Sequence, residues 1–62
     1  MKIIYRDEEW EIRSGMTTRD AIIKVGLDPD AVLAVREGKL INEDTILKKE
    51  DRVTLVAVVS GG

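Results

Sequence analysis

With 62 residues, 44% of them hydrophobic and 35% charged, the chain has the size and composition of one small folded domain. Its formal net charge is −2 with both signs interspersed, which argues against a nucleic-acid surface. It contains neither cysteine nor histidine, which excludes disulfides, thiolate nucleophiles and the commonest metal ligands. No apolar run is long enough to cross a membrane, so we expect a cytoplasmic protein that contacts neither nucleic acid nor membrane.

The first regular structure predicted is an N-terminal hairpin. Apolar and polar residues alternate from Lys2 to Arg6 and again from Trp10 to Arg13, which is the period of a strand with one buried face. Between them, Asp7-Glu8-Glu9 is an acidic run, which we interpret as a solvated turn rather than a cation site.

A single helix is predicted after the break at Ser14-Gly15. Thr17 is a good N-cap and Asp20 stands three residues later, as in a capping box. Gly26 suits the left-handed position that ends a helix. The apolar residues expected to face the core are Ala21, Ile22 and Val25. A helix of about eight residues is unstable alone, so it must pack on a sheet.

Three more strands are predicted in the second half of the chain. Val32 to Arg36 and Lys39 to Ile41 flank a turn at Glu37-Gly38, and Ile46-Leu47 forms a small apolar plug. The last strand, residues 53–59, is apolar almost throughout and rich in valine, as is typical of a strand at the centre of a sheet.

This order of elements predicts an α+β domain in which one helix covers one face of a mixed sheet of four or five strands. If the first and last strands pair in parallel at the sheet centre, the arrangement is a β-grasp. We expect the β-grasp domain to span residues 1–59, and residues 60–62 to form a flexible Ser-Gly-Gly tail.

The face of the sheet without a helix is predicted to carry an apolar patch. If Ile3, Leu33, Val35, Val53 and Leu55 point at the helix, alternation turns another set of residues away from it. These are Ile4, Ala34, Val56 and Val58. Contiguous apolar patches on small proteins often mark docking surfaces, so we expect this one to dock a partner, although β-propensity alone also explains such residues.

The chain ends in Ser60-Gly61-Gly62, directly after the last strand. Glycine packs nothing and loses the most entropy on ordering, so a diglycine here suggests that the α-carboxyl of Gly62 is the working group. That group has a pKa near ~3.5 and is a poor electrophile when ionised. It must be activated as an acyl phosphate or acyl adenylate, and a partner must supply that chemistry. We therefore do not expect the chain to be an enzyme.

The whole chain resembles the ubiquitin-like β-grasp sulfur carriers, which include the ThiS, MoaD and TtuB types and the small archaeal modifier proteins. The resemblance starts at the opening strand and rests on four further segments. They are residues 17–27 (TTRDAIIKVGL), 34–38 (AVREG), 49–53 (KEDRV) and 58–62 (VVSGG). A diglycine alone is a weak signal, but together with this helix and turn pattern it is a specific one.

The resemblance implies that an E1-like adenylating enzyme of the ThiF/MoeB type, which uses ATP and Mg, activates Gly62. A cysteine desulfurase or rhodanese would then supply sulfur to form a thiocarboxylate. That thiocarboxylate would pass the sulfur to a synthase in the thiamin thiazole or molybdopterin pathway, or to a tRNA thiolase. The partners would recognise Ser60, Gly61 and Gly62, and no cofactor of the carrier's own is implied. Two alternatives stay open: a ubiquitin-like modifier joined to lysines, and a non-covalent β-grasp binding module.

Overall fold

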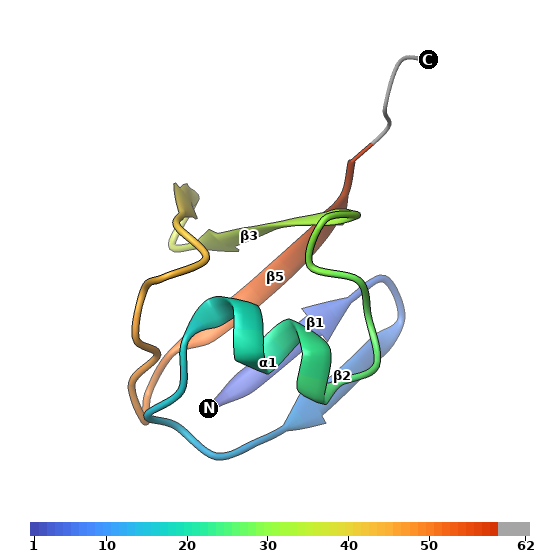
Figure 1. The fold of residues 1–62 in the computed structure, drawn as a ribbon. Coiled ribbons are helices and arrows are strands. Elements are labelled where there is room, and N and C mark those ends of the chain that lie inside the picture. The colour runs from blue at the N-terminus through green and yellow to red at the C-terminus, as the bar shows by residue number, and fades with distance from the viewer. Residues whose placement is uncertain (59–62) are drawn as a thin grey trace.

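The computed structural model describes residues 1–58 as a five-stranded mixed sheet with one helix lying across one face (Figure 1). The elements in chain order are β1 (Lys2–Tyr5), β2 (Glu8–Glu11), α1 (Thr18–Lys24), β3 (Val32–Arg36), β4 (Lys39–Ile41) and β5 (Arg52–Ala57). The strand order is β2-β1-β5-β3-β4, in which β1 and β5 are parallel and every other pair is antiparallel. This confirms the predicted α+β, β-grasp architecture.

The centre of the sheet is the parallel pair of β1 and β5, and it supplies the middle of the core. Ile3 lies opposite Val53, and both are fully buried. Leu55 follows two residues later on the same face and is also buried. Alternation along a strand explains why residues 53 and 55 share this face. The helix covers it with Ala21 and Ile22, which are buried against these strands.

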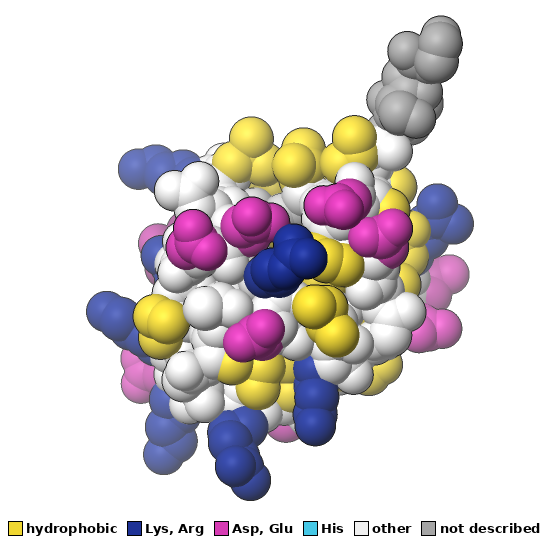
Figure 2. Space-filling model, viewed as in Figure 1, with side chains coloured by type: hydrophobic (Ala, Val, Ile, Leu, Met, Phe, Trp, Pro, Cys, Tyr) yellow, Lys and Arg dark blue, Asp and Glu magenta, His cyan; other side chains and the backbone are white. Residues whose placement is uncertain are grey.

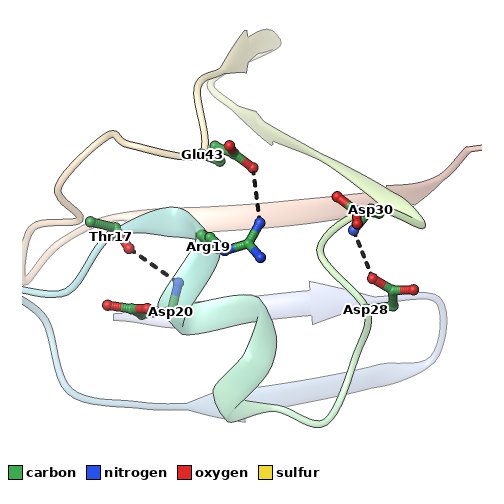
Figure 3. Close-up of polar contacts among 6 residues, drawn as sticks. All are labelled: Thr17, Arg19, Asp20, Asp28, Asp30 and Glu43. Atoms are coloured by element: carbon green, nitrogen blue, oxygen red, sulfur yellow. Dashed lines mark hydrogen bonds and ion pairs between the residues drawn. The ribbon is translucent and has the colours of Figure 1, made fainter.

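The helix begins and ends with the caps that the sequence predicts. The Thr17 hydroxyl accepts a hydrogen bond from the Asp20 backbone N–H at 3.1 Å (Figure 3). At the other end, Gly26 has φ 86° and Leu27 N–H donates to the Ile22 carbonyl at 3.1 Å. This 6→1 bond is a Schellman motif, which needs the left-handed residue that glycine provides.

One buried polar side chain joins the helix to the loop before β5. The Thr18 hydroxyl is buried and donates to the Thr45 carbonyl at 3.2 Å, and that carbonyl also accepts from the Thr18 backbone N–H at 2.9 Å. Arg19 N–H donates to the Glu43 carbonyl at 3.0 Å. The loop therefore satisfies N–H groups that a helix leaves open in its first turn.

The two hairpins differ in how well the sequence predicts their turns. In β3–β4 the turn is Glu37-Gly38, as predicted, with φ 53° and 78°. Two positive φ values are those of a type I′ turn, whose twist suits a hairpin. In β1–β2 the predicted turn at residues 7–9 is wrong, because Tyr5 lies opposite Glu8 and the turn is Arg6-Asp7. Acidic residues can stay exposed in an edge strand just as they do in a turn. The acidic composition of residues 7–9 therefore gave no indication that β2 begins at Glu8.

Asp51 fastens the turn before β5 to the end of β3. Its carboxylate accepts from the Lys48 backbone N–H at 2.8 Å and from the Arg36 guanidinium at 2.9 Å. The backbone hydrogen bond from Lys48 has the largest effect and lowers the pKa of the Asp51 carboxyl. Burial, the next largest effect, opposes it, and the hydrogen bond of Arg36 and the charges of Arg36 and Lys48 lower the pKa further.

Two other expectations need correction. Leu47 is buried, but Ile46 is 55% exposed, so only one residue of the predicted apolar plug enters the core. The last strand runs from Arg52 to Ala57 rather than over residues 53–59. Val59 and the predicted Ser-Gly-Gly tail, residues 60–62, lie outside the described residues.

Candidate functional site

The end of β5 is where the central strand leaves the sheet. Val58, the last described residue, still donates its N–H to the Ala31 carbonyl at 2.9 Å. Ala31 directly precedes β3, so the departing chain is held against β3 until this point. In Figure 1 the end of β5 lies at the margin of the sheet, beside the loop that leads into β3. The predicted recognition residues Ser60, Gly61 and Gly62 lie beyond it, outside the described residues.

The open face of the sheet, opposite the helix, carries large exposed apolar side chains beside this end. Val56 is 48% exposed and lies directly opposite Leu33, which is 47% exposed. Val58 is 42% exposed and Leu40, opposite Val35 in the outer strand, is 67% exposed. We call the set Leu33, Val35, Leu40, Val56 and Val58 the open-face patch. Three of the five strands contribute to it.

The structure corrects one member of the predicted patch. Ala34 is only 5% exposed and lies between Leu55 and Ile41, all three on the face that the helix covers. The predicted phase of β3 was therefore wrong by one residue, and Leu33 takes the outward position. Since a one-residue slip exchanges the two faces of a strand, the same error placed Val35 on the wrong side. Because β3 is apolar on both faces, alternation gave no signal that could fix its phase.

The other predicted patch residues lie on the expected side. Ile4 is half-buried on β1, where it pairs with the exposed Thr54 of β5. Val56 and Val58 are exposed two and four residues further along β5. The structure brings Val56 and Val58 to the end of β5, with Ile4 further back on the neighbouring strand. The sequence-based prediction missed Leu33 and Leu40. Leu40 could have been found, because the middle residue of a three-residue strand has few core residues to pack against.

Charge is distributed unevenly along the strands. Asp7, in the β1–β2 turn, and Asp28 and Asp30, in the loop before β3, are exposed near the end of β5. At the other end of the strands, Lys2 lies opposite Arg52. Figure 2 shows most dark blue side chains along the lower and left edges, and a row of magenta ones across the upper half. The end from which the chain leaves β5 is therefore the acidic end.

The described residues offer little material for catalysis. Within residues 1–58 no group of three or more acidic or metal-ligating side chains is placed to hold a metal ion. No helix in this part of the chain is long and apolar enough to cross a membrane. Among residues 1–58, Asp51 has a lowered pKa, and it is a structural carboxylate at the opposite end of β5.

The sheet with its single helix defines a small ubiquitin-like β-grasp protein. The family model described as the ThiS family matches residues 1–62, and the chain belongs to the ThiS family. It is similar to the sulfur carrier protein TtuB of Thermus thermophilus, with 28% identity over 65 residues that cover 100% of both chains.

Proposed function

We propose that this chain is a sulfur carrier, whose Gly62 carboxyl is adenylated by an E1-like enzyme and then converted to a thiocarboxylate. The observation that carries the proposal is the ThiS family match, which extends over the whole chain through Gly62. The similarity to a protein named sulfur carrier protein TtuB supports the same function. Final acceptors in thiamin thiazole, molybdopterin or thiolated tRNA synthesis are all compatible with this chemistry.

The proposed chemistry takes place at the Gly62 carboxyl. A carboxylate oxygen attacks the α-phosphorus of ATP, pyrophosphate leaves, and an acyl adenylate forms. A thiol then attacks the persulfide of a cysteine desulfurase or a rhodanese, becomes part of a disulfide and releases hydrosulfide, which attacks the acyl carbon. The C–O bond to AMP breaks, a proton is lost, and the thiocarboxylate remains. The carrier supplies the carboxyl and the surface that presents it, while the partner supplies ATP, Mg and the catalytic groups.

In this proposal the open-face patch docks the activating enzyme. Leu33 and Val56 lie side by side near the end of β5, so a partner that covers them also borders the point where the described chain ends. An apolar centre with a charged rim is the usual anatomy of such interfaces. Because Asp28 and Asp30 are exposed in the loop that leads to Ala31, beside the end of β5, we expect the partner to present basic side chains around the cleft that receives the terminus.

The proposal is tested by the intact mass of the protein recovered from its native cell under thiol-free conditions. The expected product is a species heavier by the exchange of one oxygen for sulfur, with the change mapped to Gly62. A variant that lacks Gly62 is the matched control and should never gain this mass. If neither the native material nor the protein incubated with an E1-like enzyme, ATP and hydrosulfide carries sulfur, the proposal is wrong.

A second candidate, a ubiquitin-like modifier, uses the same activated carboxyl. Attack by a lysine amine in place of hydrosulfide gives an isopeptide bond, and lysines of other proteins that carry Gly62 branches would identify it. A non-covalent β-grasp binding module is the third outcome. In that case binding to the partner persists when Gly62 is deleted.

A further inference from the structure

The fold places every lysine of the chain away from the end of β5. The five lysines are Lys2, Lys24, Lys39, Lys48 and Lys49. Lys2 lies opposite Arg52, the first residue of β5. Lys39 lies opposite Arg36, the last residue of β3. Because β3 and β5 are antiparallel, both lysines belong to the same end of the sheet, which is opposite Val58.

The other three lysines also lie away from the end of β5. Lys48 and Lys49 occupy the turn that leads into β5, where the Lys48 N–H is bound by Asp51. Lys24 extends from the helix to a hollow that it lines with Glu11 and Arg13. Glu11 lies opposite Lys2, so this hollow also belongs to the far end of the sheet.

Charged groups near the end of β5 are of other kinds. Arg6 directly follows Tyr5, which lies opposite Leu55, and its guanidinium sits 5.2 Å from the centre of the Tyr5 ring. Asp28 accepts from the Asp30 N–H at 2.9 Å in the loop before Ala31 (Figure 3). The cation at this end is therefore a guanidinium, which stays protonated and accepts no acyl group under ordinary conditions.

The length of the chain between Val58 and Gly62 limits which lysines the C-terminal carboxyl can reach. Gly62 stands four residues after Val58, a stretch that spans at most about 14 Å. Arg52 stands six residues before Val58, or about 20 Å along the strand. The five bonds of a lysine side chain add about 6 Å. Gly62 could therefore meet Lys2 only if both the terminus and the side chain were stretched to their limit.

We infer that the absence of lysine around the end of β5 protects the activated C-terminus from attack by the chain itself. The inference rests on the function proposed above. An amine joined to the acyl carbon through a short stretch of chain has an effective concentration on the order of millimolar, so it would compete with external nucleophiles. Its nitrogen would form an amide with the Gly62 carbonyl, and the adenylate or thiolate would leave with loss of a proton. The product would be a closed ring that can no longer carry sulfur.

The separation also determines which acceptors remain. Hydrosulfide, or a lysine of another protein, reaches the acyl carbon from outside. A second copy of this chain can offer Lys48 or Lys49, which are exposed, but only in an encounter between two molecules. In this proposal the positions of the lysines alone leave the acyl group to external nucleophiles.

The test uses the full chain prepared as a Gly62 thioester through an intein fusion, so no activating enzyme is needed. Arg6→Lys places an amine near the end of β5 without changing the charge, and Arg52→Lys is its matched control at the far end. Asp30→Lys and Glu50→Lys form a second pair that changes the charge equally. Circular dichroism verifies that each variant is folded, and intact mass with peptide mapping follows the closed ring against the hydrolysed acid.

We expect Arg6→Lys and Asp30→Lys to close the ring roughly tenfold faster or more than the wild type, as expected for a nearby amine. Arg52→Lys and Glu50→Lys should behave as the wild type. Equal ring closure in all five proteins would overturn the inference and leave the sulfur-carrier proposal intact. Conversely, a wild-type protein that forms no thiocarboxylate with its activating enzyme counts against the proposed function and not against the thioester result.

Discussion

The two faces of the sheet are built from the same strands but have different roles. Along β5, Val53 and Leu55 turn inward and are buried, whereas Thr54 and Val56 turn outward and are exposed. The covered face is sealed by the helix, so its apolar residues stabilise the fold. No other element among residues 1–58 covers the open face, so its apolar residues can contact another molecule. Substitutions should therefore separate stability from recognition, one face at a time.

The largest expected effect is on the covered face. Ile3→Ala removes a fully buried side chain at the sheet centre and should lower the free energy of unfolding by about 2–4 kcal/mol. A domain of this size has roughly 3–9 kcal/mol in total, so much of the protein could unfold. Urea denaturation followed by circular dichroism measures the change. The matched control on the open face, Val56→Ala, should cost under about 1 kcal/mol, and equal losses would contradict the division between the faces.

The next effect is on recognition. Val56→Asp places a charge in the open-face patch and should reduce kcat/KM for adenylation by the activating enzyme by about thirtyfold or more, equivalent to ~2 kcal/mol at an interface hot spot. Its free energy of unfolding should change by less than about 1 kcal/mol, since the position is half exposed. Pyrophosphate release gives the rate. Arg13→Asp, outside the patch, is the control, and an unchanged rate for Val56→Asp would remove the docking proposal.

A smaller effect concerns Asp51, at the end of the sheet where β5 begins. Asp51→Asn removes a charge-assisted hydrogen bond and should cost about 1 kcal/mol at neutral pH. The folded pKa of Asp51 is lowered, so its stabilisation is present above the ordinary carboxyl pKa and is lost as the pH falls through the folded value. The wild type should therefore lose more stability than the variant as the pH falls below about 4. Parallel loss in both proteins would show that the Asp51 hydrogen bonds contribute nothing.

The smallest effect on stability should come from Leu40→Ser. Leu40 is the most exposed of the large apolar residues, and surface changes of this kind stay within about 0.5 kcal/mol. Adenylation should nevertheless fall severalfold if the patch extends to the β4 edge. Comparison with Leu33→Ser, at the patch centre, measures how far the contact reaches. If Leu33→Ser lowers the rate of adenylation less than Leu40→Ser does, the patch is not centred on Leu33.

Much of the fold follows from local signals in the sequence. Thr17 and Gly26 cap the helix as predicted, and Glu37-Gly38 adopts the expected hairpin turn. These signals work because each depends on one residue and its immediate neighbours. The phase of β3 could not be predicted in this way, because Leu33 and Ala34 are both apolar and only packing decides between them. Packing against Leu55 and Ile41 selected the smaller side chain for the core.

The candidate site, like the fold, could be predicted from the sequence only in part. The outward positions of Val56 and Val58 follow from alternation along one strand. The partner residue Leu33 depends on the register between β3 and β5, which no local pattern contains. The distribution of lysines likewise becomes visible only when the strands are placed side by side, because Lys2 and Lys39 are far apart in the sequence.

The parallel pairing of β1 with β5 also has a kinetic consequence. It joins Lys2 to Arg52, fifty positions apart (52 − 2), so the sheet closes around its centre only after a long loop has formed. Such non-local pairing makes folding slower than that of helical domains of the same size. A partner that contacts Leu33 and Val56 together needs β3 and β5 to be paired, so it recognises the assembled sheet and not the separate strands. Chains in which β3 and β5 have not yet paired would therefore not present this contact.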